Sequence, residues 1–236
     1  MSRLAIITGG AGSVGPHVGE GLIKDGFDVV LTDINPRVIE IAEGIGAKGV
    51  VGDVTSLESM QQVMAPYDRI DAIITAHSAW PINTIDELTV EKWNFEITLN
   101  LTAAFIVTKA ALAGLRAAKG SIVHFASSCA LKGFAEMIPY GAAKAGLIGL
   151  TRQLAASLGP DGINANCVIP GGMATESNKT PDGGWPDWMD VMVNSRAIPR
   201  LGYAEDLVGA ACFLVSPGAK FITGQSMIVD GGYLFQ

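Results

Sequence analysis

The chain has 236 residues, of which 49% are hydrophobic and 17% are charged, and its formal net charge is −7 at pH 7. This length and composition favour one sizeable folded domain and exclude an intrinsically disordered chain. The acidic balance and the absence of a basic run argue against a nucleic-acid partner.

The three cysteines, Cys129, Cys167 and Cys212, show neither a metal-site spacing nor a disulfide framework, so we expect no metal site and a reducing cytoplasm. The N-terminal apolar run is too short for a signal peptide. The most apolar helical stretch, Leu99–Leu115, is interrupted by Lys109, so no membrane span is expected.

Short apolar strands alternate with helical segments along the chain. The predicted strands are Leu4–Thr8, Asp28–Asp33, Gly49–Gly52, Ile70–Thr75, Ser121–Ala126, Asn164–Ile169 and Ser226–Val229. The predicted helices are Pro16–Asp25, Arg37–Gly44, Leu57–Met64, Val90–Ala118, Tyr140–Leu158 and Ala204–Leu214. Runs such as AIIT and DVVLT are apolar on both faces, which is typical of a parallel sheet covered by helices on both sides. The alternation predicts an α/β fold of the Rossmann type, a doubly wound parallel sheet of about seven strands.

No linker or composition break divides the chain, so residues 1–236 are predicted to form a single dinucleotide-binding and catalytic domain. The one long irregular segment is Gly171–Pro199, which is rich in Gly, Pro and Trp. A loop of this length inside a compact domain is usually functional or disordered, and we predict a substrate lid at 176–199.

A glycine-rich turn lies between the first predicted strand and helix, in the stretch LAIITGGAGSVG. Gly9 and Gly10 permit a tight turn, and Gly12 and Gly15 let the backbone approach a ligand. The helix that starts near Val14–Pro16 would direct its N-terminal amides at a pyrophosphate. At the first β–α junction this loop favours a dinucleotide site over a simple turn.

Two carboxylates follow the second and third predicted strands. Asp33 can accept hydrogen bonds from the ribose hydroxyls and repel a 2′-phosphate, which favours NAD over NADP; the alternative is a helix cap or loop residue. Asp53 could bind the adenine amine, with Val54 packed on the ring, although an Asx-type turn fits its spacing almost as well.

The stretch PYGAAK places Tyr140 and Lys144 four residues apart, which by itself also fits a solvated helix face. Together with other stretches, however, it resembles the short-chain dehydrogenase/reductase family, in its short single-domain NAD(P)-dependent branch. The resemblance runs from Leu4 to Gly232. It rests on TGGAGSVG (8–15), DV (53–54), LNLTAAF (99–105), Ser127, YGAAK (140–144), VIPGGMAT (168–175) and ITGQSMIVDGG (222–232).

The resemblance implies that Tyr140 is the catalytic acid/base and Lys144 its partner. Ser127, thirteen residues before Tyr140, would orient the substrate carbonyl, and Asn100 would support a proton-relay water. A cation one helical turn away, with the positive charge of a nicotinamide, is expected to favour the Tyr140 phenolate. The cofactor contacts it implies are Gly9, Gly12, Ser13, Val14, Gly15, Asp33, Asp53, Val54, Tyr140, Lys144, Pro170, Gly171, Met173 and Thr175.

The sequence departs from the family pattern at three places. Ser13 replaces a loop glycine, TAHS (75–78) replaces the usual NNAG, and His124 stands where the family often has asparagine. We expect the TAHS segment to alter the local backbone and the adenosine-ribose contacts rather than the chemistry. For His77 and His124 a hydrogen-bonded structural role is preferred to catalysis or metal binding.

An aromatic and methionine-rich set of residues is expected near the active site, and it favours a small hydrophobic or aromatic alcohol or ketone. Packing of the lid against the body or a neighbouring subunit is the alternative for each of them. The pocket candidates are Trp80, Cys129, Met137, Trp185, Trp188 and Met192.

The sequence therefore predicts an NAD-dependent alcohol dehydrogenase or carbonyl reductase. The competing prediction is a dinucleotide-binding sensor without turnover, which would be expected to have lost Tyr140 or Lys144. By resemblance we also expect a homo-oligomer, most often a tetramer.

Overall fold

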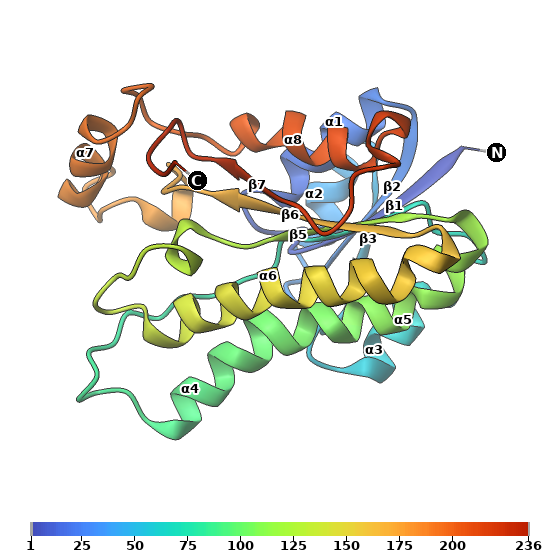
Figure 1. Ribbon diagram of the computed structural model, residues 1–236, viewed down its shortest axis with the longest axis horizontal. Helices are drawn as coiled ribbons and strands as arrows, with labels where there is room; N and C mark the ends of the chain where they lie inside the picture. The colour runs from blue at the N-terminus through green and yellow to red at the C-terminus, as the bar shows by residue number, and fades with distance from the viewer. Residues whose placement is uncertain (1, 236) are drawn as a thin grey trace.

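The computed structural model describes residues 2–235, apart from the side chain of Ser177. Its centre is one seven-stranded sheet with the order β3-β2-β1-β4-β5-β6-β7, in which all neighbouring strands are parallel (Figure 1). The strands are β1 Arg3–Thr8, β2 Phe27–Asp33, β3 Lys48–Val51, β4 Ala72–Thr75, β5 Ser121–Phe125, β6 Asn164–Pro170 and β7 Ser226–Val229. The strand order reverses between β1 and β4, and ligands of such sheets bind at the carboxyl ends near that point.

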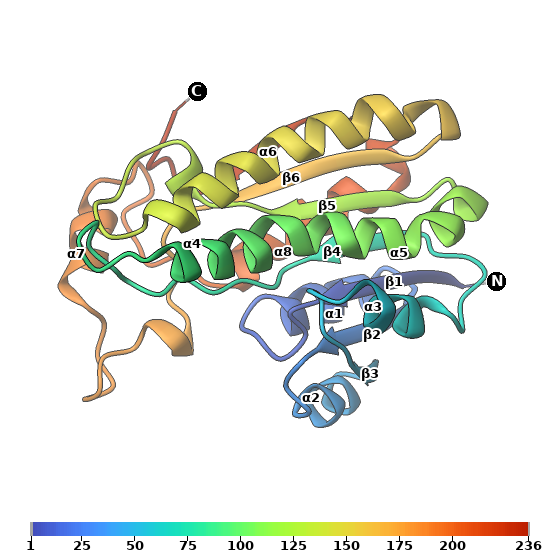
Figure 2. The same ribbon diagram turned by 90° about the horizontal axis from the view of Figure 1, so that it is seen from below.

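Helices cover both faces of the sheet (Figures 1 and 2). Helices α1, α2 and α8 lie on one face, and α3 to α6 lie on the other. Their bounds are α1 Gly15–Lys24, α2 Val38–Gly44, α3 Leu57–Met64, α4 Val90–Ile97, α5 Ala103–Ala118, α6 Ile138–Leu158, α7 Asp187–Asn194 and α8 Glu205–Val215. The predicted Rossmann-type fold class is confirmed.

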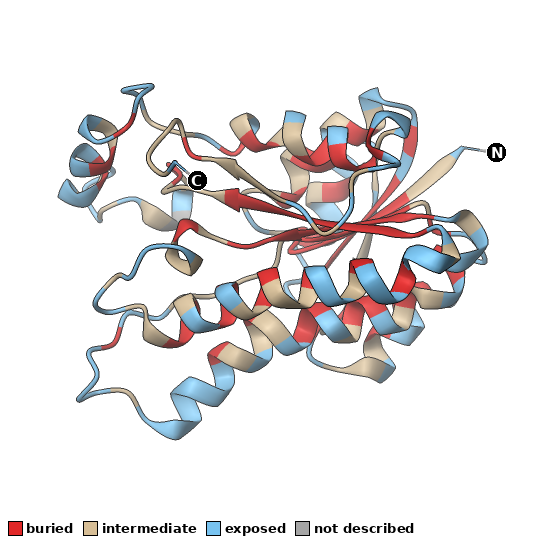
Figure 3. Ribbon diagram, in the orientation of Figure 1, coloured by how far each residue is buried: buried red, intermediate tan, exposed pale blue. Residues whose placement is uncertain are grey.

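The core is made of two apolar layers, one on each side of the sheet (Figure 3). Consecutive residues of β1 point to opposite layers: Ile7 packs with Leu31 and Leu207 on one side, and Ile6 with Ile73 and Leu115 on the other. Because every residue of β4 is buried, this strand reads as a continuous apolar run rather than an alternating one.

The structure refines the predicted elements at several points. The bounds of β7 and α3 are those predicted, and the segment after β6 contains a helix, α7, that was not predicted. The predicted helix Val90–Ala118 is α4 and α5 joined by a π-helical segment, Thr98–Thr102. By length and composition this run could cross a membrane despite Lys109, but a core helix passes the same test, and its inner face packs on the sheet and on α3 and α6.

Candidate active site

The turn between β1 and α1 is shaped by glycines, and at two of them the backbone leaves no room for a side chain. Gly9 has φ +71°, and a Cβ on it would lie 2.6 Å from the backbone of Ala76 and His77. A Cβ on Gly15 would lie 2.6 Å from the Gly9 carbonyl oxygen, whereas one on Gly12 would meet only that oxygen at 3.2 Å. Gly9 and Gly15 are therefore required by close packing, and Gly12 is the open member of the loop.

Helix α1 begins at this turn with features that suit an anion. Val14 is the N-cap residue, Pro16 lies in the first turn, and neither a capping side chain nor an acidic residue occupies the helix start. First-turn amides and the helix dipole favour a negative group at such a position. The residues present thus fit the phosphates of a dinucleotide.

Asp33, the last residue of β2, and Asp53, which follows β3, accept hydrogen bonds from nearby loop residues. Asp33 Oδ2 accepts a hydrogen bond from the Ala11 amide at 3.0 Å, which ties the end of β2 to the glycine turn. Asp53 Oδ1 accepts hydrogen bonds from the Thr55 amide and hydroxyl at 2.8 and 2.7 Å, which is the Asx-type turn that the sequence left open. Val54 beside it is buried.

The polar residues of the chemical site come from the end of β5 and the start of α6. Ser127 is extended, with φ −164°, and its Oγ accepts a hydrogen bond from the Cys129 amide at 3.2 Å. Tyr140 and Lys144 lie in the first two turns of α6, with Lys144 Nζ 5.5 Å from the Tyr140 ring centroid. Lys144 Nζ donates a hydrogen bond to the Phe125 carbonyl at 2.8 Å, so β5 fixes the ammonium group.

Burial is the main cause of the pKa shifts of Tyr140 and Lys144. Burial raises the pKa of Tyr140 well above its usual value, the nearby Cys129 adds to the rise, and hydrogen bonds with the side chains of Ser127 and Ser78 oppose it. Burial also lowers the pKa of Lys144 to about 8. Both side chains are more than nine-tenths buried, and the loss of hydration disfavours the charged form of each in the protein by itself. That Lys144 together with a bound nicotinamide favours the phenolate stays a prediction.

Asn100 lies in the π-helical segment, a distortion that is frequent at functional sites. Its Nδ2 donates hydrogen bonds to the carbonyls of Ala79, at 2.8 Å, and Glu96, at 3.1 Å. Its buried Oδ1 has no hydrogen-bond partner among the described residues. Asn100 thus braces the loop after β4, and its role in a proton relay stays a prediction.

A cavity of about 490 Å³ joins the start of α1 to Tyr140 and runs under α7. Its walls are mostly apolar. The predicted site residues that line it are Val14, Trp80, Ser127, Cys129, Met137, Tyr140, Lys144, Pro170, Gly171, Met173, Thr175, Trp188 and Met192. The predicted site residues outside its lining are Gly9, Gly12, Ser13, Gly15, Asp33, Asp53, Val54, Asn100 and Trp185.

Trp185 is the pocket candidate that the structure places elsewhere. Its ring lies 5.7 Å from Lys179 Nζ, on the segment before α7. In its place Val191, from the same helix as Trp188 and Met192, lines the cavity. Because α7 was not predicted, no helical face could be used to separate Trp185 from the residues that line the cavity.

Other lining residues were missed as well. They include Ser78, Phe134, Glu136 and Tyr233, which come from the loop after β4, the loop before α6 and the C-terminal tail. Ser78 carried a usable signal, because it ends the TAHS segment directly after a buried strand. The Ser78 side chain from this segment lines the cavity together with Tyr140, and the expectation that the segment leaves the chemistry untouched stays a prediction.

The two histidines near the site have the structural partners that were expected. His77 Nδ1 contacts Thr8 Oγ1 at 2.5 Å, and His124 Nδ1 contacts Thr75 Oγ1 at 2.8 Å. Burial, and then the charge of Lys144, lower the pKa of each to about 3, so both rings are neutral at physiological pH. Within residues 2–235, no group of three or more His, Cys, Asp and Glu side chains could hold a metal ion.

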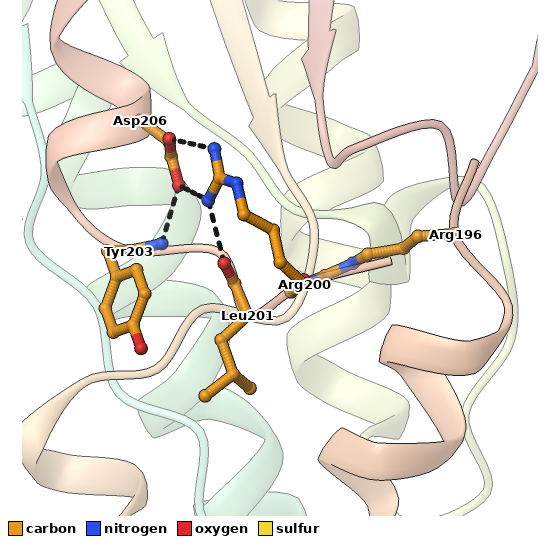
Figure 4. A network of polar contacts seen from close by, with 5 residues as sticks. All are labelled: Arg196, Arg200, Leu201, Tyr203 and Asp206. Atoms are coloured by element: carbon orange, nitrogen blue, oxygen red, sulfur yellow. Dashed lines mark hydrogen bonds and ion pairs between the residues drawn. The ribbon is translucent and has the colours of Figure 1, made fainter. Parts of the chain in front are cut away.

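The C-terminal end of the predicted lid is fastened by an arginine network (Figure 4). The buried Arg196 donates through Nη1 to the Arg200 carbonyl at 2.9 Å and through Nη2 to the Gly172 carbonyl. Arg200 in turn binds both carboxylate oxygens of Asp206, each at 2.7 Å. These contacts join the end of the lid to the residues after β6 and to the start of α8.

Comparison with known proteins agrees with this geometry. A family model described as enoyl-(acyl carrier protein) reductase matches residues 9–234. The chain is 30% identical over 243 residues to an NAD-dependent glycerol dehydrogenase of Listeria innocua, covering 98% of this chain and 93% of that one. It is 28% identical over 243 residues to a D-threitol dehydrogenase of Mycolicibacterium smegmatis, covering 98% and 92%.

Solved structures lead to the same class. The structure titled "Crystal structure of gox2181" superposes with a TM-score of 0.91 at 27% identity, covering 98% of this chain and 95% of the other. The fold and these matches define an oxidoreductase with a Rossmann-like single sheet. The chain belongs to the short-chain dehydrogenase/reductase family.

Proposed function

We propose that this chain is an NAD-dependent dehydrogenase/reductase that interconverts a small hydrophobic or aromatic secondary alcohol and its ketone. The observation that carries the proposal is the position of Ser127, Tyr140 and Lys144 in the wall of one mostly apolar cavity. Proton-transfer groups are thereby placed beside a space that suits an apolar substrate.

Each of the three side chains has a distinct task. Tyr140 donates its phenolic proton to a carbonyl oxygen in reduction and accepts the hydroxyl proton in oxidation. Ser127 hydrogen-bonds the same substrate oxygen and holds it against the phenol. Lys144, fixed by the Phe125 carbonyl, supplies positive charge beneath the Tyr140 ring. A bound nicotinamide dinucleotide would supply the hydride donor or acceptor.

The raised pKa of Tyr140 bears on the direction of the reaction. The neutral phenol is the form that donates a proton, so the protein by itself favours carbonyl reduction at neutral pH. Alcohol oxidation needs the phenolate, and its rate should increase as the pH rises. Initial rates in both directions from pH 6 to pH 10 test this point.

The preference for NAD is supported by Asp33. Its carboxylate ends β2 beside the glycine turn, where it can accept hydrogen bonds from ribose hydroxyls and where a 2′-phosphate would meet a negative charge. The turn glycines and the start of α1 would hold the pyrophosphate. Comparison of kcat/KM for NAD⁺ and NADP⁺ at fixed substrate tests the preference, and a higher value for NADP⁺ would contradict it.

The class of substrate is supported by the residues around Tyr140. Two relatives are named for the polyols glycerol and threitol, whereas Trp80, Met137, Trp188 and Met192 give this cavity a largely apolar wall. We therefore expect turnover of aryl and alicyclic alcohols with NAD⁺ to exceed that of glycerol and threitol. Activity confined to polyols, charged sugars or acyl thioesters would refute this substrate class.

The second candidate function is a dinucleotide-binding sensor on the same fold. Tyr140→Phe separates the two, since the enzyme should lose turnover while still binding NADH. We further propose that residues 176–199 act as the substrate lid of a single domain, that the protein assembles as a homotetramer, and that it works in the cytoplasm. Light scattering of the purified protein tests the tetramer.

A further inference from the structure

Ser78 belongs to the segment in which this chain departs most from its family, and it lines the cavity with Ser127 and Tyr140. Because a serine replaces the usual glycine there, a hydroxyl stands where the family pattern has no side chain. Ser78 and Ser127 line the same cavity as Tyr140, and hydrogen bonding from both side chains opposes the rise of the Tyr140 pKa. Ser127 reaches the phenol from the end of β5 and Ser78 from the end of β4.

The position of Ser78 is fixed from both sides along the chain. The preceding residue, His77, is held by the 2.5 Å contact of its Nδ1 with Thr8 Oγ1 at the end of β1. The carbonyl of the following residue, Ala79, accepts the 2.8 Å hydrogen bond from Asn100 Nδ2. A short loop anchored on each side holds its middle residue in one place.

The next residue, Trp80, completes this arrangement. Its ring centroid lies 6.0 Å from that of Tyr140 with an interplanar angle of 57°, within the range of favourable aromatic pairs. The loop after β4 therefore contacts Tyr140 through both a hydroxyl and an aromatic ring. Asn100, through Ala79, supports the loop that presents them.

We propose that Ser78 is a positioning residue of the catalytic centre, which donates a hydrogen bond to the Tyr140 oxygen and holds the phenol toward Ser127 and the substrate oxygen. This inference rests on the proposed function. The donated bond stabilises the phenolate relative to the phenol, so Ser78 partly offsets the effect of burial on Tyr140. It forms no covalent bond and consumes no co-reactant.

Several other ionisable groups surround Tyr140 and Lys144. Lys144 lies on the same helix as Tyr140, Cys129 faces it from the turn after β5, and Glu96 acts on it from α4. His77 and His124 both interact with Lys144. Since all of these remain in a Ser78 variant, a change in the titration of Tyr140 reports on Ser78.

The main experiment compares the pH dependence of alcohol oxidation in wild type, Ser78→Ala and Ser78→Thr. Loss of one hydrogen bond to the phenolate should raise the apparent pKa of the ascending limb by about half a unit to one unit and lower kcat/KM below it about 3- to 10-fold. Ser78→Thr keeps the hydroxyl and should recover much of the rate. The matched control is Ser226→Ala, which removes a buried β7 hydroxyl without a partner among the described residues.

Two outcomes would overturn the proposal. One is a Ser78→Ala profile that superimposes on the wild type. The other is an equal loss in Ser78→Ala and Ser78→Thr with no shift along the pH axis, which would show that the position acts only through packing.

A second measurement does not depend on turnover. The protein has four tyrosines, so the ¹³Cζ resonance of Tyr140 in ring-labelled protein can be assigned with Tyr140→Phe. Loss of the Ser78 hydrogen bond should shift that resonance at neutral pH, and Ser226→Ala should leave it in place. If no alcohol or ketone is turned over, the proposed function fails while this shift still decides the role of Ser78. An unchanged resonance in Ser78→Ala refutes that role.

Discussion

At the β1–α1 junction close backbone packing sets the shape of the turn, whereas the β5–α6 junction presents side chains to the cavity, although both junctions lie at the carboxyl edge of the same sheet. At the first junction Gly9 and Gly15 leave no room for a Cβ, and the helix start is uncapped by side chains. At the second, Tyr140 and Lys144 are buried and their pKa values move in opposite directions. We propose that the first junction serves cofactor binding and the second serves proton transfer.

This contrast predicts that substitutions at the two junctions should have different effects. Changes at the glycine turn act on backbone geometry, so they should affect folding or cofactor binding. Changes at Tyr140 and Lys144 act on charge and proton transfer, so they should affect rate while sparing the fold. The predictions below probe this separation, beginning with the largest effect.

Tyr140→Phe should produce the largest loss. Removal of a positioned acid/base group lowers kcat by about 10²- to 10⁴-fold. Fluorescence titration should show that NADH binding is retained, because the ring and its contact with Trp80 remain. Tyr203→Phe, at an exposed position, is the control and should keep wild-type activity. Unchanged turnover in Tyr140→Phe would remove this residue from the chemistry.

Gly9→Ala should damage the fold rather than the chemistry. A Cβ at φ +71° and 2.6 Å from backbone atoms of Ala76 and His77 should lower the free energy of unfolding by about 2–3 kcal/mol. Urea denaturation measures the change. Gly12→Ala is the matched variant, since its Cβ meets only one oxygen at 3.2 Å, and it should stay within about 1 kcal/mol of wild type. Equal losses in the two variants would contradict this distinction.

Lys144→Met should reduce turnover yet stabilise the folded protein at neutral pH. The folded-state pKa of Lys144 is about 8, below the unfolded value of 10.5, so unfolding takes up a proton between these two values. Stability of the wild type should therefore rise from pH 8 to pH 10.5, and it is lowest, for this group, below pH 8. The advantage of Lys144→Met should be about 2–3 kcal/mol at pH 7 and should vanish toward pH 10.5.

Thermal unfolding of both proteins at pH 7, 9 and 10.5 checks this sign. A variant that is less stable than wild type at pH 7 would show that the 2.8 Å bond to the Phe125 carbonyl outweighs the loss of hydration. Lys109→Met, on a different helix, provides the control for removal of one positive charge.

Asp33→Asn should weaken the preference for NAD. Loss of the negative charge should reduce kcat/KM for NAD⁺ about tenfold and narrow the gap to NADP⁺, since one charge-assisted hydrogen bond is worth about 1.5–3 kcal/mol. Asp53→Asn is the comparison, because Asp53 bonds within its own turn through Thr55, whereas Asp33 is tied to the glycine turn through the Ala11 amide. An equal effect of both variants would show that neither carboxylate is specific for the cofactor.

Trp188→Ala should have the smallest effect, confined to substrate binding. It opens the wall of the cavity beneath α7 and should raise KM for an aromatic alcohol a few-fold, about 1 kcal/mol or less, with kcat little changed. Trp185→Ala should leave KM unchanged, because Trp185 does not line the cavity. Reversed effects of these two variants would restore the sequence-based assignment of Trp185.

The helices and strands predicted best are those whose local residue pattern agrees with their place in the fold. β7 and α3 match their predicted bounds, and the parallel sheet covered by helices follows from the β–α alternation. α7 was missed because the Gly- and Pro-rich residues around it dominate the local signal. The π-helical turn at Asn100 was missed because no simple residue pattern specifies an added residue in a helix.

The candidate site likewise contains residues that could be predicted from the sequence and residues that could not. Ser127, Tyr140 and Lys144 were found because their spacing matches a family motif, and the structure gathers them in one cavity. The sequence-based reasoning left out the rise that burial causes in the Tyr140 pKa, because spacing reports the distance to Lys144 and not the depth of burial. The position of Ser78 is set by a loop that residues of β1 and of the π-helical segment anchor. No local sequence pattern reveals those anchoring contacts.

The arginine network at the end of the lid has a consequence for limited proteolysis. Residues 181–183 are exposed in a turn before α7, whereas Arg196 is buried and bound to the Gly172 and Arg200 carbonyls. A protease that cleaves at this turn leaves α7 on the C-terminal fragment, which Arg196 binds to the rest of the domain. The nicked protein should therefore elute as one particle and keep Trp188 and Met192 over the cavity.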